Sequence, residues 1–169
     1  MNVRAICNGR FALPMPPADA RTLFTPEGER RWAGSSWNPI YAIRGAAEDD
    51  SAPGTVFTTE SDGGKATWIV LERRHDGMRY ARVAHDRIAG TIDVVCTQGE
   101  SSDVTEVAVT YDVTSLGPEG GAFVKELEAS FEEFLEGWRR RFLRGLGEGV
   151  SLKSSRGAFI AIAADVSCG

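Results

Sequence analysis

Between Gly121 and Arg144 the apolar positions of the chain recur at helical spacing. Six large apolar side chains follow one another at steps of four, four, four, three and four residues, which keeps them on one side of a helix. They are Phe123, Leu127, Phe131, Leu135, Trp138 and Phe142. The charged residues between them are acidic first and basic later, as a helix dipole favours. We expect a long amphipathic helix that starts near Pro118, stops at Gly145 and packs on a broad apolar surface.

Upstream of this helix the apolar positions change to the alternation of β-strands. Phe11, Leu13 and Met15 alternate from Arg10 to Met15, and prolines follow. Later runs rich in β-branched and aromatic residues cover Thr55–Glu60, Ala66–Arg74, Met78–His85, Ile88–Thr97 and Val104–Thr114. Short turn sequences separate these runs, and short connections make neighbouring strands antiparallel.

The last of these runs has one apolar face. Thr105, Val107, Val109, Tyr111 and Val113 point one way, and mostly polar residues point the other way. Ile88–Thr97 shows a similar division. Such faces supply the surface that the long helix needs.

Two short helices are expected after the first strand. One covers Ala18 to Phe24, and a second begins at Pro26 behind a Thr25 cap and runs to about Ala33. The predicted fold class is therefore α+β, with a curved antiparallel sheet that closes over a C-terminal helix. We expect a single domain over residues 1–169 with its core at about 9–144.

The segment 145–169 departs from this pattern. Glycines at 145, 147 and 149 form a joint, and a second apolar run covers Ala158–Val166. Three interpretations stay open: an extra strand or packed tail, a tail that docks on another subunit of a homodimer, and a disordered end.

Composition excludes some classes of partner. With 42% hydrophobic residues the chain can bury a sizeable core, and its net charge of −5 argues against nucleic acid or an anionic membrane as the main partner. Arginines 139, 140, 141 and 144 are a local exception. They are typical of a solvated helix end, and a specific anion site is the alternative.

The three cysteines, Cys7, Cys96 and Cys168, are widely separated and form no CxxC pair. They are interpreted as reduced thiols. The N-terminus lacks the pattern of a secretory signal, and no apolar run is long enough for a membrane span. A cytoplasmic location is the expectation.

Catalytic and metal-binding patterns are weak. His75 lies in a turn sequence and is expected at the surface, while His85 and Asp86 are strand neighbours that face opposite ways and form no dyad. The histidines and cysteines lack the spacing of metal ligands. The glycines at 145–149 precede no Lys-Ser/Thr pair, which argues against a phosphate loop. We therefore expect no metal, no cofactor and no catalytic residue assignable from sequence.

Several stretches resemble a known group of proteins. They are residues 17–33, Gly54-Thr55-Val56-Phe57, Thr67-Trp68, Thr105 to Tyr111 and the helix that leads to Trp138. Together they resemble bacterial members of the SRPBCC superfamily, the START-like, polyketide cyclase and birch-pollen-allergen-related group. The resemblance covers roughly residues 9–144 and implies a helix-grip fold, in which about seven bent strands grip a long C-terminal helix around a cavity. The runs above account for six strands, and Pro39 to Ile43 is the candidate for the seventh.

The resemblance makes the space between sheet and helix the candidate ligand site. The ligand-binding candidates are Trp68, Tyr80, Arg82, Tyr111, Phe131 and Trp138; the alternative for each aromatic residue is plain core packing. Tyr80 and Arg82 share one strand face, and Arg79 and His85 the other. An inward Arg82 would need an acidic partner or an anionic ligand.

The favoured function is a small-molecule binding protein that holds a hydrophobic or aromatic ligand in that cavity. The first alternative is a polyketide cyclase or aromatase-like enzyme that uses Arg82, Tyr80 or His85 on a carbonyl chain. A further alternative is a protein-interaction module similar to START-like chaperone activators, with the segment Ala158–Val166 as the contact.

Overall fold

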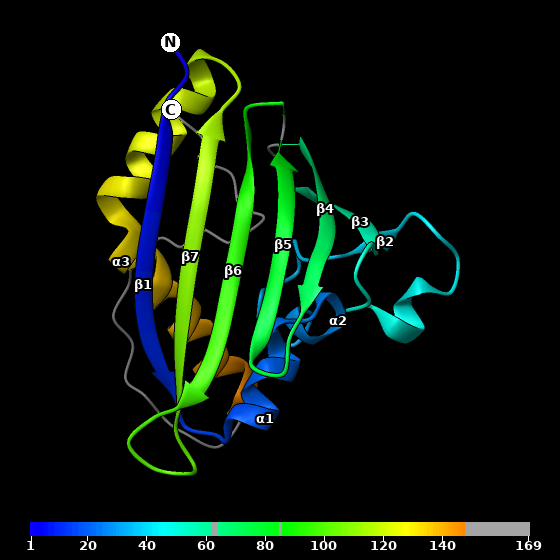
Figure 1. Cartoon of the computed structure of the whole chain (residues 1–169), viewed down its shortest axis with the longest axis vertical. Helices are drawn as coiled ribbons and strands as arrows, with labels where there is room; N and C mark the ends of the chain where they lie inside the picture. Colours follow the sequence, from blue (N-terminus) through cyan, green and yellow to red (C-terminus); the bar gives the residue numbers. More distant parts are fainter. Residues whose placement is uncertain (62–63, 85, 148–169) are drawn as a thin grey trace.

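The computed structural model describes residues 1–61, 64–84 and 86–147. Its strands form one antiparallel sheet in the order β1-β7-β6-β5-β4-β3-β2 (Figure 1). They are β1 (Arg4–Leu13), β2 (Ile40–Tyr41), β3 (Val56–Ser61), β4 (Gly64–Arg73), β5 (Gly77–Ala84), β6 (Ile88–Gln98) and β7 (Thr105–Ser115). The β2 strand confirms the seventh strand expected near Pro39 to Ile43, and β3 to β7 confirm the five central runs within two residues at each end.

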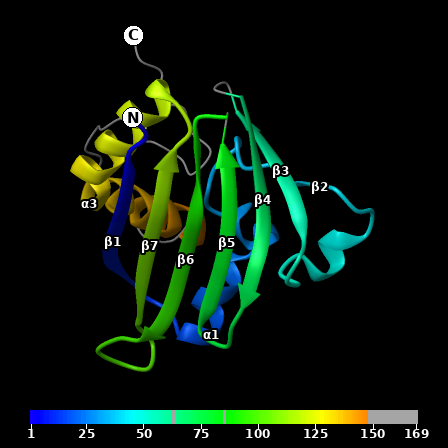
Figure 2. The same ribbon diagram turned by 45° about the horizontal axis from the view of Figure 1, so that its top comes forward.

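The helices α1, α2 and α3 cover one face of this sheet, and two 3-10 turns complete the described helical segments. They are α1 (Pro17–Ala20), the 3-10 turn η1 (Arg21–Phe24), α2 (Pro26–Glu29), the 3-10 turn η2 (Ala46–Asp49) and α3 (Pro118–Leu146). Figures 1 and 2 show α1, α2 and α3 behind the same face, while η2 lies in the loop that projects beyond β2. This arrangement is the α+β helix-grip architecture that the sequence predicted.

The first strand differs from its prediction. It begins at Arg4 instead of Arg10 and ends at Leu13 instead of Met15. The alternation of buried positions continues upstream through Cys7 and Ala5, whose small side chains are less conspicuous in the sequence. Ten consecutive residues of β1 pair with β7, so the strand that precedes the helices lies beside the strand that leads into α3.

The long helix confirms the amphipathic stripe with three corrections. It continues through Gly145 to Leu146, with Gly147 as its C-cap. It is kinked at Ser130, whose hydroxyl donates a 2.8 Å hydrogen bond to the Glu126 carbonyl, a local bond that bends helices. At its start the fully buried side chain is Val124, and Phe123 is only partly buried.

Close contact between α3 and the sheet depends on Gly9 in β1. A Cβ atom at this position would lie 2.3 Å from Leu135 Cδ1 and 3.4 Å from the Phe131 ring. The absence of a side chain therefore lets the middle of α3 approach the strand.

The short helix α2 is held by two capping acceptors. The Thr25 hydroxyl accepts a 3.0 Å hydrogen bond from the Gly28 amide, and the Asp50 carboxylate accepts a 2.7 Å bond from the Glu27 amide. Sequence analysis correctly placed the Thr25 cap and Pro26 start, but the regular helix ends at Glu29 rather than near Ala33. The preceding segment, expected as one helix, divides into α1 and η1.

Burial across the sheet follows the predicted alternation. The side chains of Val107, Val109, Tyr111 and Val113 on β7 are buried. Cys7 and Cys96 are buried free thiols, in agreement with their interpretation as reduced. Within the described residues, no helix has the length and apolar character needed to cross a membrane. His85, Cys168 and the run Ala158–Val166 lie outside the described residues, so expectations about them stay predictions.

Candidate ligand-binding site between sheet and helix

The six ligand-binding candidates are all buried. Trp68 comes from β4, Tyr80 and Arg82 from β5, Tyr111 from β7, and Phe131 and Trp138 from α3. Their burial is also what core packing would give, so their role in binding a ligand stays a prediction. Their polar atoms are more informative, because several of them have no hydrogen-bond partner in the described chain.

Arg82 is a buried cation. The side chains of Tyr80 and Arg82 face inward on β5, while Val83 between Arg82 and Ala84 is exposed. The Arg82 guanidinium carbon lies 4.8 Å from the centre of the Trp68 ring, a cation-π contact. Its Nε has no hydrogen-bond partner. Burial lowers the pKa of Arg82, and this effect is opposed by the nearby Tyr111 and Glu29.

The acidic partner expected for an inward Arg82 is Glu29, the last residue of α2. Glu29 is only 5% exposed, and its Oε2 has no hydrogen-bond partner. Burial raises the pKa of the Glu29 carboxyl well above its ordinary value, and Arg82 opposes that shift. The two groups interact electrostatically, yet within the described chain they form no direct ion pair. A polar group placed between them would complete the hydrogen bonding of both.

Tyr111 and Trp138 add two further polar atoms without partners. The Tyr111 hydroxyl and the Trp138 indole Nε1 are buried and form no hydrogen bond. Their rings are 6.3 Å apart in an edge-to-face arrangement. Burial raises the pKa of the Tyr111 hydroxyl, so this group is a neutral donor at physiological pH.

The remaining candidates have mainly structural contacts. The Tyr80 hydroxyl donates a 2.6 Å hydrogen bond to the Phe24 carbonyl and so ties β5 to η1. The Trp68 indole donates a 3.0 Å bond to the buried Thr59 hydroxyl. Phe131 packs edge-to-face on Tyr111 at 5.6 Å. These contacts surround the site with aromatic side chains.

Four orphaned polar atoms from α2, β5, β7 and α3 therefore lie in an otherwise aromatic interior. We call Glu29, Arg82, Tyr111 and Trp138 the buried polar cluster. Native interiors satisfy nearly all such atoms, so each exception requires an explanation, and an ordered water or ligand is the usual one. The cluster offers donors from Arg82, Tyr111 and Trp138 and a carboxyl group that can donate or accept.

Sequence reasoning missed Glu29. It expected an acidic partner or an anionic ligand opposite an inward Arg82 but could not name an acid, because Glu29 is 53 positions away along the chain. The Thr25-Pro26 helix start was the available signal, since it fixes which residue ends the first turn of α2.

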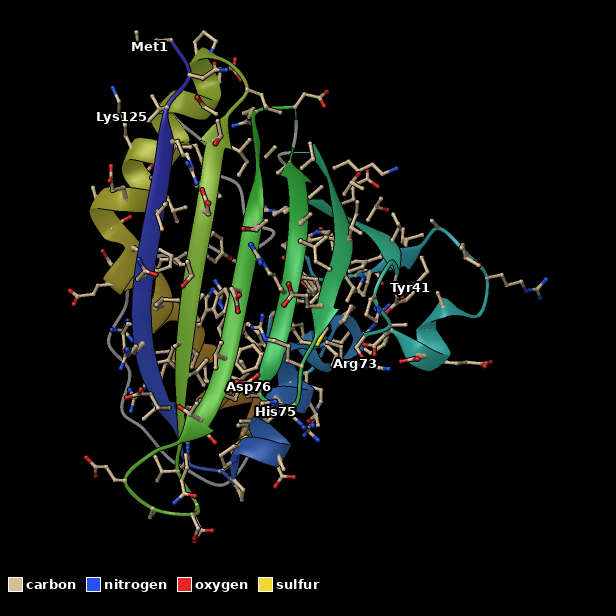
Figure 3. All side chains as sticks on the ribbon, in the orientation of Figure 1. Met1, Tyr41, Arg73, His75, Asp76 and Lys125 are labelled. Carbon is tan, nitrogen blue, oxygen red and sulfur yellow. The ribbon has the colours of Figure 1, made fainter. Side chains whose placement is uncertain are left out.

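His75 lies at the surface, as the sequence predicted. The His75 side chain is 92% exposed, and its Nδ1 lies 3.9 Å from Asp76. Figure 3 shows both residues at the turn between β4 and β5, at the lower end of the sheet. His75 also borders a surface groove of about 490 Å³ beside Arg21 and Met78. His75 therefore belongs to the surface, far from the inward faces that carry the buried polar cluster.

Comparison with known proteins is informative at the level of the fold. No protein-family model matches the sequence, and a search of curated proteins finds no match. Solved structures do match. Norcoclaurine synthase from Thalictrum flavum, in complex with dopamine and hydroxybenzaldehyde, has a TM-score of 0.61 at 10% identity, covering 89% of this chain and 91% of that one.

Two bacterial structures match similarly. CalU16 from Micromonospora echinospora has a TM-score of 0.54 at 14% identity and covers 88% of this chain and 87% of its own. The Mll3558 protein from Rhizobium loti has a TM-score of 0.59 at 15% identity, with 86% and 99% covered. The chain thus has the helix-grip fold that the sequence resemblance implied. Identities this low establish the fold and leave the function to the site itself.

Proposed function

We propose that this protein binds a small hydrophobic or aromatic molecule between its sheet and α3. The buried polar cluster carries the proposal. A buried donor or acceptor without a partner costs about 1–3 kcal/mol, and a ligand hydroxyl or carbonyl among Glu29, Arg82 and Tyr111 would provide the missing hydrogen bonds. The apolar body of the ligand would contact the aromatic residues around the cluster. The ligand cavity that this requires stays a prediction.

The fold neighbours support this class of ligand. Norcoclaurine synthase has the same fold and was solved with two small aromatic molecules, dopamine and hydroxybenzaldehyde. Binding by this chain is inferred from its own cluster, and the neighbour supports only the size and character of the ligand.

The four tryptophans provide a direct test. The indoles of Trp32, Trp37 and Trp68 donate to protein oxygens, whereas the Trp138 indole has no acceptor. In ¹H–¹⁵N spectra, titration with 2-naphthol should shift the Trp138 indole signal most strongly and saturably, because the hydroxyl oxygen can accept from it. Replacement of Trp138 by phenylalanine assigns the signal.

Naphthalene is the matched probe without the hydroxyl. It should bind about tenfold or more weakly, because it leaves the polar cluster unsatisfied. Arg82→Met should reduce the difference between the two probes. If neither probe nor a panel of apolar aromatic compounds shifts the Trp138 signal, the proposed site is wrong.

A cyclase-like enzyme is the second candidate function. Glu29 favours it, because burial raises the pKa of its carboxyl group and so favours the protonated form that can donate a proton, while the Arg82 cation and the Tyr111 hydroxyl polarise a carbonyl oxygen. A poly-β-keto thioester is a suitable substrate probe.

The two functions predict different fates for that probe. An enzyme should release a cyclised product, and Glu29→Gln should slow its formation by about 10²–10⁴-fold while probe binding persists. Recovery of the unchanged probe from the wild-type protein, with saturable binding, would leave the binding function and remove the enzymatic one.

A further inference from the structure

A second pocket lies on the surface where α2 and its following loop meet the end of α3. Its volume is about 660 Å³. Four arginines line it, Arg30 and Arg31 from the α2 side and Arg141 and Arg144 from α3, together with the nearly buried rings of Trp32 and Trp37. We call this pocket the arginine groove.

The charged residues in the described lining of the groove are all basic. Its described lining contains four arginines and no aspartate or glutamate, in a protein whose net charge is −5. Arg30 is neutralised nearby, with a 2.7 Å ion pair to Glu27 and a 2.7 Å hydrogen bond to Asn38. In the described part of the chain, Arg141 has neither an ion pair nor a side-chain hydrogen bond.

Arg141 is the unusual member of the groove. Its Nη1 is buried and has no hydrogen-bond partner among the described residues. The adjacent Arg139 and Arg140 share Glu136 on their own helix, at 3.4 and 3.3 Å. Burial lowers the pKa of Arg141, and the positive charge of Arg144 lowers it further. The fold therefore holds this cation in an unfavourable setting that a bound anion would relieve.

Compensation of the α3 dipole does not explain this arrangement. Arginines that serve only the dipole hydrogen-bond to the last helix carbonyls or extend into water. Arg141 forms no hydrogen bond to a carbonyl in the described chain, and its Nη1 is not solvated.

We propose that the arginine groove binds the oxyanion of a soluble small molecule, a phosphate or a carboxylate. Arg141 provides the guanidinium fork that matches such an anion, and Arg31 and Arg144 add positive charge at the rim. Trp32 and Trp37 border the groove with rings that are almost entirely buried, so recognition of the anion depends on the arginines.

The groove shares no residue with the buried polar cluster, although the two adjoin through aromatic contacts. Trp32 packs on Trp138 with a centroid distance of 5.4 Å, and Trp37 packs on Trp68 at 5.3 Å. The two tryptophans thus line the groove and also contact aromatic residues of the interior. Binding in the groove does not depend on the function proposed for the interior.

Arg140 provides a matched control for the test. Arg140→Gln and Arg141→Gln remove the same charge from neighbouring positions on α3, but only Arg141 lines the groove. Phenyl phosphate and benzoate are titrated by calorimetry at constant ionic strength, and the indole signals of Trp32 and Trp37 are followed by NMR. We expect saturable binding that Arg141→Gln weakens about tenfold or more and Arg140→Gln about twofold or less. Arg141→Lys should recover part of the affinity.

Thermal unfolding without anion shows whether the variants are folded. Arg141→Gln should match or exceed the wild-type midpoint, since it removes an uncompensated, half-buried cation. Phenyl phosphate should raise the midpoints of the wild type and Arg140→Gln, and that of Arg141→Gln much less. Equal weakening by both glutamine variants would show nonspecific charge attraction and overturn the proposal. Absence of saturable binding would overturn it too, as would binding to phosphatidylserine vesicles in place of the soluble probes.

Discussion

The most informative residues of this protein are polar groups placed where apolar ones would be expected. Arg82 lies on the inward face of β5, and Glu29 faces it from α2 without forming an ion pair. Burying charges is costly unless they are paired and hydrogen-bonded. An incomplete pair of this kind inside an aromatic core should therefore lower stability unless another group completes its hydrogen bonding.

Glu29 has a measurable effect on stability. Because burial raises the pKa of Glu29 in the folded protein, the folded state keeps a proton that the unfolded chain releases near pH 4.5, the group's ordinary pKa. The free energy of unfolding of the wild type should thus decrease as pH rises from that value towards the raised pKa. The gap between Glu29→Gln and wild type should widen across this window, by up to about 1.4 kcal/mol per pH unit.

Urea denaturation over a pH series measures this difference. Glu132→Gln is the matched control, because Glu132 is exposed on α3 and its replacement should leave the wild-type pH dependence unchanged. Parallel curves for Glu29→Gln and wild type would show that Glu29 ionises in the folded protein as it does in the unfolded chain.

Residue alternation predicted half of the candidate site. It placed Tyr80 and Arg82 on one face of β5, and Tyr111 with the apolar side chains of β7, and both groupings are observed. It left open which face of β5 turns inward, because that strand carries arginine on both faces. Glu29 could not be identified, since its position depends on how α2 docks against the sheet.

At the scale of elements, the short helix α2 decides where Glu29 lies. It is four residues long and ends at Glu29. A helix this short depends on its caps, because few of its backbone groups are bonded internally. Thr25 and Asp50 supply those caps from two different segments of the chain.

Removal of the Thr25 hydroxyl should therefore destabilise the protein. We expect Thr25→Ala to lower the free energy of unfolding by about 1 kcal/mol in chemical denaturation, the usual cost of a lost N-cap. Thr25→Ser keeps the accepting oxygen and should remain close to wild type. Equal losses in the two variants would point to the threonine methyl group and away from the cap.

The long helix shows what periodicity can and cannot predict. The stripe from Leu127 to Phe142 was correct, because a helix that covers a sheet needs apolar residues at this spacing. The kink at Ser130 was not foreseen. It depends on a serine bonding back to Glu126, and an interior serine can equally well point into water.

At the scale of the whole molecule, one curved sheet closes over α3 and buries nearly all of its inward face. Cys7 on β1 and Cys96 on β6 are both buried there. Burial raises the pKa of the Cys96 thiol to about 12. Both the thiolate form and access by reagents are therefore suppressed in the folded protein.

Alkylation by iodoacetamide at about pH 8 tests this closure. Peptide mapping should show that Cys7 and Cys96 react at least about a hundredfold more slowly in the native protein than in urea. In the native protein, modification has to wait for opening of the sheet. A cysteine introduced by Ala12→Cys, at an exposed position of β1, should react quickly in both states. Rapid native labelling of Cys96 would show that β6 opens readily.

The amino-acid pattern by itself determined the elements of this protein and the faces they bury. Alternation and helical spacing are local properties, and burial of a matching face stabilises them wherever the partner comes from. Only the tertiary structure decided which polar groups meet. Glu29 lies within electrostatic range of Arg82, and Arg141 lines one groove with the loop after α2. Both arrangements depend on packing between segments that are distant in the sequence.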